Sequence, residues 1–229
     1  MTSNNLTPDI FSLSIPALAI DIVIFTVYKG SLYLLLNQRT EDGPEKGKYI
    51  LPGGIVRSGL SLEENFDNIL QNRTGIKGVY KEQLYTFGDV NRDPRGHVVS
   101  VTYYALVSSD LFMQNVDLTK VHIIDYSRID EISIGYDHEK IIKYAKQRLD
   151  WKLEYTNIVK NILPQEFTLS RMQAVYESIL DTKLDKRNFR KKIASLNILK
   201  DTGNLDKSTN RPAALYSFSD NELKIVGIL

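Results

Sequence analysis

The chain has 229 residues, of which 42% are apolar and 25% are charged, and it contains no cysteine. This length allows one or two domains with a packed core, and the missing cysteine excludes disulfides and thiolate zinc sites. No apolar run reaches about 18 residues, and the N-terminal M-T-S-N-N-L-T-P-D lacks the basic region and apolar core of a signal peptide. We therefore expect a cytoplasmic protein without a transmembrane helix.

The net charge of +1 conceals an uneven distribution along the chain. Residues 1–150 contain 16 lysines and arginines against 19 acidic residues, whereas residues 151–229 contain 13 against nine. Between residues 183 and 211 there are nine basic residues and three acidic ones. A basic region confined to one end predicts a polyanionic partner there. The alternative is a solvated basic surface that binds nothing.

Strand patterns dominate the first half of the chain. Residues 17–27 are almost wholly apolar and rich in β-branched side chains, which predicts a buried central strand. Residues 31–39 form a second strand, and the Lys29-Gly30 turn between the two predicts a hairpin. Further strands are expected over residues 79–90, 97–108 and 121–124, and a helix over residues 136–155.

A glycine-bounded helix is expected within residues 53–76, which read G-G-I-V-R-S-G-L-S-L-E-E-N-F-D-N-I-L-Q-N-R-T-G-I. Ser61 followed three residues later by Glu64 is a capping box, so the helix should begin at Ser61. Gly75 stands where a left-handed glycine would end the helix. Four apolar residues share one helical face: Leu62, Phe66, Ile69 and Leu70.

This loop–helix–loop resembles the Nudix box. That pattern runs Gly, five residues, Glu, seven residues, then Arg-Glu-hydrophobic-any-Glu-Glu-any-Gly-hydrophobic. Laid over the chain, its glycines and hydrophobic positions match Gly54, Leu70, Gly75 and Ile76. Its charged positions do not match: they hold Leu60, Asn68-Ile69 and Asn72-Arg73.

The lost groups are those that hydrolysis would need. Cleaving a nucleoside diphosphate requires divalent metal ions, hard cations such as Mg²⁺ need carboxylate ligands, and Arg73 would repel them. The resemblance therefore implies a Nudix fold used for binding, with no catalytic residue, no metal and no cofactor. One alternative is a Nudix hydrolase acting on ADP-ribose or another nucleoside diphosphate, with a displaced metal site built from Glu63, Glu64 and Glu82.

The last third of the chain predicts a winged helix-turn-helix. A short helix is expected over residues 157–163, a second from residue 167, a third over 185–197, and two short strands over 198–200 and 214–218. In the third helix, Phe189, Ile193 and Leu196 should face inward. The opposite face is basic and carries amide and small side chains, which suits a DNA major groove.

Three segments in this region resemble the DNA-binding domain of Nudix-related transcriptional regulators: F-T-L-S-R-M-Q-A-V-Y-E-S-I-L, L-D-K-R-N-F-R-K-K-I and R-P-A-A-L-Y-S-F. The resemblance implies an α/β protein, with a Nudix α/β/α sandwich around a mixed sheet (residues 1–152) as effector sensor and a winged helix (residues 153–229) on DNA. Such regulators form homodimers, bind palindromic operators, and respond to ADP-ribose-like nucleotides or to pentoses such as L-arabinose. Whether this one is a repressor or an activator is left open.

Carried over to this chain, the family's DNA contacts fall on the third helix and the wing. Arginine and asparagine read base edges, and lysines hold phosphates. Each charge alone could instead be merely solvated, and a basic helix could also meet an acidic protein partner. The candidate DNA-binding residues are Arg171, Lys186, Arg187, Asn188, Arg190, Lys191, Lys200, Lys207 and Arg211.

The effector should lie against the box loop and its neighbours. Arginines clamp phosphates and aromatic rings stack on bases, while Asp89 and Asp93 could accept sugar hydroxyls. Phe87 and Tyr103 could alternatively be sheet core. The candidate effector-binding residues are Arg39, Gly53, Gly54, Arg57, Phe87, Asp89, Arg92, Arg95, His97 and Tyr103. Effector binding would then change the relative placement of the two winged helices across the dimer.

Overall fold

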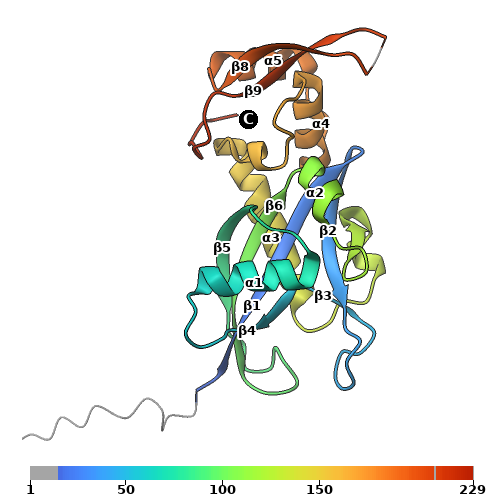
Figure 1. The fold of residues 1–229 in the computed structure, drawn as a ribbon, viewed down its shortest axis with the longest axis vertical. Coiled ribbons are helices and arrows are strands. Elements are labelled where there is room, and N and C mark those ends of the chain that lie inside the picture. The colour runs from blue at the N-terminus through green and yellow to red at the C-terminus, as the bar shows by residue number, and fades with distance from the viewer. Residues whose placement is uncertain (1–14, 209, 229) are drawn as a thin grey trace, which may run out of the picture.

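A mixed sheet forms the body of the N-terminal half in the computed structural model of the protein, which describes residues 15–208 and 210–228 (Figure 1). The first nine residues, from which we expected no signal peptide, lie outside the described residues. The strand order is β3-β2-β1-β6-β5, with β4 on β1 and β7 on β2. Only β1 and β6 run parallel among these pairs. The strands are β1 (Ala17–Tyr28), β2 (Ser31–Gln38), β3 (Tyr49–Ile50), β4 (Gly53–Ile55), β5 (Tyr80–Phe87), β6 (Val98–Val107) and β7 (His122–Asp125).

Strand β1 is central because both of its faces are apolar. Ile20, Ile22 and Ile24 point to one face of the sheet, where they join the core beneath helices α1 and α2. The alternate residues Val23 and Phe25 join the core on the other face, beneath α3. A strand buried on both faces has no polar alternation, so the apolar run correctly predicted its central place.

The β1–β2 hairpin closes through a two-residue turn. Tyr28 pairs with Ser31, and both residues between them, Lys29 and Gly30, have positive φ angles of 48° and 82°. Two consecutive positive φ values match the right-handed twist of the flanking strands. The hairpin expected from the Lys29-Gly30 pair is confirmed.

Helix α1 (Leu62–Thr74) has the ends that its sequence predicted. Ser61 accepts a hydrogen bond from the Glu64 backbone, and the Glu64 side chain bonds back to Ser61 N at 2.7 Å. Gly75 follows with a φ of 80°. Phe66 and Leu70 are buried against the sheet, so the capping box fixes where the helix begins and its apolar face fixes how it packs.

Two short helices were not expected from the sequence. They are α2 (Ser109–Asn115) and the 3₁₀ helix η2 (Tyr126–Glu131). Each is too short to show a helical period. The long helix α3 (His138–Tyr155) lies across the opposite face of the sheet from α1 and leads into the C-terminal part (Figure 1). Helices on both faces of a mixed sheet confirm the α/β/α sandwich.

The C-terminal part is a winged helix. It comprises the 3₁₀ helix η3 (Ile158–Asn161), α4 (Leu169–Leu180), α5 (Lys186–Ser195), β8 (Leu199–Asp206) and β9 (Ala213–Phe218). Strands β8 and β9 pair antiparallel as the wing. The first expected helix is a single 3₁₀ turn, because Pro164 follows it closely and cannot continue a helix.

The two parts share one hydrophobic core. Leu149 and Leu153 of α3 belong to the same buried cluster as Ile158, Tyr176 and Phe189 of the winged helix. The division expected between residues 152 and 153 falls within the last turn of α3, and it stays a prediction. No helix in the described ranges is long and apolar enough to cross a membrane.

Candidate nucleic-acid interface and ligand cleft

Helix α5 turns its apolar residues inward and its basic residues outward. The Asp185 side chain caps the helix by accepting from Asn188 N at 2.8 Å. Phe189 and Ile193 are buried, and the Phe189 ring packs edge-on against Tyr176 with centroids 5.5 Å apart. The predicted DNA-binding residues of the helix are therefore all exposed: Lys186, Arg187, Asn188, Arg190 and Lys191.

Most cations of α5 have no internal partner. Lys186, Arg187 and Lys191 make no hydrogen bond or ion pair with any described residue, and Arg190 makes one hydrogen bond, from Nη2 to Ser170 Oγ at 3.0 Å. Cations that stay solvated can pair with phosphates without first breaking an internal bond. Lys192, also exposed on α5, was not singled out, although a count of basic residues would have found it.

The other predicted DNA contacts lie apart from α5. Lys200 stands on β8, and Lys207 and Arg211 lie in the loop that joins β8 to β9, so these three belong to the wing. The Arg171 side chain is bonded to the N-terminal part of the chain. Its Nη2 donates to Ser109 Oγ of α2 at 2.8 Å, at the junction with the N-terminal part. A contact between Arg171 and the DNA backbone stays a prediction.

The structure brings half of the predicted effector residues into one cleft. It has a volume of about 280 Å³ and lies between β4, residues 92–95 and the start of α3. Arg39, Gly53, Gly54, Arg92 and Arg95 line it, as does Asp93. Sequence reasoning missed the other polar residues of its wall: Asp21, Glu41, Arg73, Tyr136 and His138.

The remaining predicted effector residues do not line the cleft. Phe87 is buried on the α3 side of the sheet, where its ring meets Tyr144. Tyr103 is buried on the other side, with its ring 5.1 Å from that of Phe66. For these two, burial agrees with the sheet-core alternative. Arg57, Asp89 and His97 are exposed and do not line the cleft, and their contact with an effector stays a prediction.

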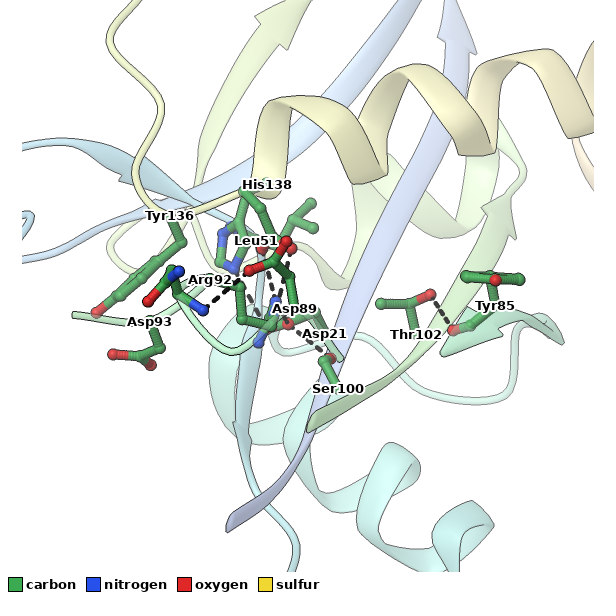
Figure 2. Close-up of polar contacts among 12 residues, drawn as sticks. Asp21, Leu51, Tyr85, Asp89, Arg92, Asp93, Ser100, Thr102, Tyr136 and His138 are labelled. Carbon is green, nitrogen blue, oxygen red and sulfur yellow. Dashed lines mark hydrogen bonds and ion pairs between the residues drawn. The ribbon is translucent and has the colours of Figure 1, made fainter. Parts of the chain in front are cut away.

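A cluster of charges lies at the floor of the cleft (Figure 2), where Asp21, Arg92 and His138 line the cleft and Asp137 does not. Asp21 accepts hydrogen bonds at Oδ2 from Arg92 Nη2 at 3.1 Å and from Ser100 Oγ at 2.7 Å. The Arg92 guanidinium also donates twice to Asp137, from Nε at 3.0 Å and from Nη2 at 2.7 Å. Only 4% of the Arg92 side chain is exposed, so its donors serve internal carboxylates.

His138 completes the floor in its neutral form. Burial lowers the pKa of His138 below its ordinary value. Its Nδ1 accepts a hydrogen bond from Leu51 N at 2.9 Å, which places the proton on Nε2. That nitrogen lies 3.6 Å from Asp21 Oδ1. The histidine is therefore held in one tautomer by the strand connection that leads to Gly53.

The rim of the cleft carries two arginines close to one tyrosine ring. The guanidinium carbons of Arg39 and Arg95 lie 5.9 Å and 5.5 Å from the centre of the Tyr136 ring. Arg39 Nε and the Tyr136 hydroxyl are buried and have no hydrogen-bond partner among the described residues. Buried polar atoms are rarely left unpaired, so these two donors are available to the acceptors of a ligand.

Asp93 fixes the second rim arginine. It accepts from Arg95 Nε at 2.9 Å and from Nη2 at 2.6 Å. Burial alone would raise the pKa of Asp93, but these bonds to Arg95 bring it below its ordinary value. The guanidinium is thereby held at the rim, with its orientation set by the carboxylate.

Gly53 allows the backbone to pass close to the floor. A Cβ atom at this position would lie 2.8 Å from the Ile20 carbonyl oxygen and closer still to Asp21 Oδ1. Only glycine fits such an approach. Arg73 then reaches across and donates from Nε to the Gly53 carbonyl at 3.3 Å, so its side chain lies at the cleft.

The carboxylates needed for a displaced metal site are not together. Glu82 bonds to Tyr104 and Lys152 on the α3 side of the sheet, whereas Glu63 and Glu64 lie on α1, on the other side. The Glu64 carboxylate also accepts a hydrogen bond from Ser61 N in the capping box. Within the described ranges, no group of three or more His, Cys, Asp or Glu residues could hold a metal ion.

A larger hollow of about 850 Å³ lies where α4 meets the β1–β2 turn. Its Lys183 and Glu177 pair with each other at 3.2 Å, and no buried unpaired polar atom lies in its wall. The smaller cleft is therefore the better candidate for a specific ligand.

Comparisons with known proteins match the chain to transcriptional regulators and to one enzyme. Residues 159–218 match the family model of the NrtR DNA-binding winged helix domain. The chain is 32% identical over 209 residues to the ADPR responsive transcriptional repressor NtrR of Acinetobacter baylyi, covering 89% of this chain and 82% of that protein. It is also 32% identical over 128 residues to an ADP-ribose pyrophosphatase of Methanocaldococcus jannaschii, covering 56% of this chain and 72% of that enzyme.

Solved structures show the same architecture. NrtR of Shewanella oneidensis in complex with a 27mer DNA superposes with a TM-score of 0.80 at 32% identity, over 88% of this chain and 93% of that one. The Nudix domain of the same protein, in complex with ADP ribose, superposes with a TM-score of 0.54 at 31% identity, over 62% of this chain and 94% of that domain. The chain belongs to the family of Nudix-related transcriptional regulators typified by NrtR.

Proposed function

We propose that the protein is a regulator that binds a palindromic DNA operator as a homodimer and changes its operator affinity when an ADP-ribose-like nucleotide binds its cleft. Residues 1–152 would sense the effector and residues 153–229 would bind DNA. The exposed cations of α5 support the DNA partner. The relatives' reported DNA and ADP ribose complexes support both ligands. Two-fold symmetry would present one α5 to each half-site.

The observation that carries the effector proposal is the unpaired polar rim of the cleft. Arg39 Nε and the Tyr136 hydroxyl are buried donors without acceptors, and Arg95 lies beside the same ring. A diphosphate offers several charged acceptor oxygens to such donors. An uncharged pentose such as L-arabinose offers no charged oxygen to these guanidinium groups, which already pair with Glu41 and Asp93, so we favour a nucleotide.

We infer that the protein does not hydrolyse this nucleotide. The box positions that would need carboxylates hold Ile69, Asn72 and Arg73, and Glu63 and Glu82 stand on opposite faces of the sheet. Arg73 would contribute positive charge to the cleft without a metal ion. The similarity to a pyrophosphatase makes hydrolysis the competing function, and Mg²⁺-dependent release of AMP from ADP-ribose would establish it.

The Tyr136→Phe variant tests the effector site. The lost hydroxyl has no hydrogen-bond partner among residues 15–208 and 210–228, so the free energy of unfolding should not fall. The affinity for ADP-ribose should fall by about 1 kcal/mol, because one hydrogen bond to the ligand is lost. Calorimetric titration measures the affinity, and Tyr33→Phe on β2, outside the cleft, is the control. Equal affinities in all three proteins would contradict the proposed site.

A further inference from the structure

We propose that Arg92 and Asp137 couple the cleft to the winged helix by tying the first turn of α3 to the cleft floor. Arg92 is then a positioning residue and does not itself bind the effector. This inference rests on the proposed function, since it assigns the route by which the effector would act on operator affinity.

The bonding of Arg92 carries the first step. Its Nε and Nη2 donate to Asp137, and Nη2 also donates to Asp21 (Figure 2). The side chain is almost wholly buried. Taking this guanidinium from its carboxylates to serve a phosphate would leave the buried Asp21 and the partly buried Asp137 without a cation, which is costly. Arg39 and Arg95 at the rim are better placed to meet the ligand.

Asp137 carries the second step. It stands at the N-cap of α3, where an aspartate ordinarily accepts a hydrogen bond from the helix backbone. Here its side chain makes no capping bond, and both carboxylate oxygens accept from Arg92 instead. The first turn of α3 therefore lacks a capping hydrogen bond, and the Asp137 carboxylate is bonded to a residue of the cleft instead.

His138 adds a second tie at the same place. As the first residue of α3, it accepts from Leu51 N at 2.9 Å. Leu51 and Gly53 both line the cleft. Two successive residues of the helix start are therefore bonded to the cleft wall, so a ligand that shifts this wall also shifts the helix start.

Helix α3 connects this end to the winged helix. Its 18 residues span about 27 Å at 1.5 Å per residue. At its far end Leu153 packs with Ile158 and Val159 of η3. The carbonyls of Glu154 and Tyr155 also accept from the C-terminal segment at Ile228 N and Val226 N, both at 2.8 Å. The side chains of α3 and of the winged helix belong to one buried cluster. A displacement of α3 therefore reaches the DNA-binding part through packed side chains.

Charge makes the floor responsive to a ligand. Two carboxylates, Asp21 and Asp137, share one guanidinium, and His138 is neutral, so the cluster carries one unbalanced negative charge. Asp21 Oδ1 accepts no hydrogen bond from any described residue. A ribose hydroxyl that donates to Asp21 would weaken its hold on Arg92 and shift the guanidinium toward Asp137. The arrangement in which Asp21 holds Arg92 and the arrangement in which Arg92 is shifted toward Asp137 then differ in their affinity for the ligand. Coupling between two sites requires such a difference in affinity.

The test is the Asp137→Asn variant, with Glu139→Gln as its matched control. Both lose one negative charge in the first turn of α3, but Glu139 bonds only to Lys143 at the surface. Operator affinity is measured by fluorescence anisotropy with and without ADP-ribose, and ADP-ribose affinity is measured with and without operator. The coupling factor is the ratio of the two affinities in each pair of measurements. Thermodynamic linkage requires the same factor from the operator measurements and from the ADP-ribose measurements.

Asp137→Asn should bind ADP-ribose and operator singly within about threefold of the unchanged protein, with its coupling factor close to one. The unchanged protein and Glu139→Gln should both show a factor of about 5 to 150. Full coupling in a folded Asp137→Asn variant would overturn the inference. If Asp137→Asn does not fold, the Arg92→Lys variant is used, because a lysine can bond to fewer carboxylate oxygens. Its coupling factor should also be close to one, and full coupling would overturn the inference. An unchanged protein that binds neither ligand contradicts the proposed function itself.

Discussion

The floor of the cleft and the outer face of α5 use basic side chains in opposite ways. In the floor, Arg92 is buried and its Nε and Nη2 donors are bound to two carboxylates. On α5, Arg187 and Lys191 are exposed and have no partner among the described residues. A paired, buried cation fixes geometry, whereas a solvated cation remains available to an external anion. The difference separates a positioning role from a binding role, which residue type alone cannot do.

The comparison predicts the largest effect for Arg92→Ala. Removing the guanidinium leaves the buried Asp21 and the partly buried Asp137 without a cation, so the free energy of unfolding should fall by about 3–5 kcal/mol. Urea unfolding measures it. Arg128→Ala is the control, because Arg128 pairs with Glu131 at the surface with most of both side chains exposed, and it should leave the stability unchanged. Equal losses in the two variants would refute the division between positioning and binding cations.

Arg187→Ala should show the reverse pattern. The side chain has no internal partner, so stability should hold, while operator affinity should fall by about 1–3 kcal/mol per half-site. Gel shifts at fixed salt concentration measure this. Lys183→Ala removes an exposed cation that is outside α5 and paired with Glu177, and it should bind normally. If both variants bind as the unchanged protein does, α5 is not the recognition helix.

The next effect concerns His138 and pH. Burial lowers its pKa, so below about pH 6.5 the unfolded chain binds a proton that the folded chain does not. Stability should therefore fall as the pH drops from about 6.5 to 5, with His138 contributing up to about 1.4 kcal/mol per pH unit. His138→Gln should lose that part of the slope in urea unfolding, and the exposed His97→Gln should keep it. A slope unchanged by His138→Gln would show that His138 is not held neutral.

The smallest expected effect is that of metal ions. Because no group of three or more His, Cys, Asp or Glu residues in the described ranges could hold a metal ion, and because Arg73 supplies positive charge at the cleft, ADP-ribose should bind equally well in EDTA and in Mg²⁺. Calorimetry in the two buffers, with Arg73→Gln lowering affinity in both, checks this. Binding that appears only with Mg²⁺ would favour the hydrolase alternative.

Local patterns predicted the parts of the fold that depend on local chemistry. The ends of α1 followed from Ser61, Glu64 and Gly75 because a cap is made by residues a few positions apart. The two faces of α5 followed from the helical period of Phe189 and Ile193. These signals need no knowledge of the rest of the chain.

The cleft depends on residues far apart in sequence, and most of its floor was missed. Asp21 meets Arg92 and Ser100, more than 70 positions away, and no periodicity connects them. One signal was present: Asp21 interrupts an otherwise apolar strand, and a buried carboxylate needs a partner. Phe87 and Tyr103 were grouped with the arginines by chain position, but the sheet places their rings on opposite faces.

One titration tests the central claim most directly. Operator DNA from upstream of the protein's own and neighbouring genes is titrated with the protein, with and without ADP-ribose, in a buffer containing EDTA. We predict sequence-specific binding that weakens with salt and changes at least about fivefold when ADP-ribose is added. Specific binding that is indifferent to ADP-ribose, or no specific binding at any salt concentration, would contradict an effector-responsive regulator.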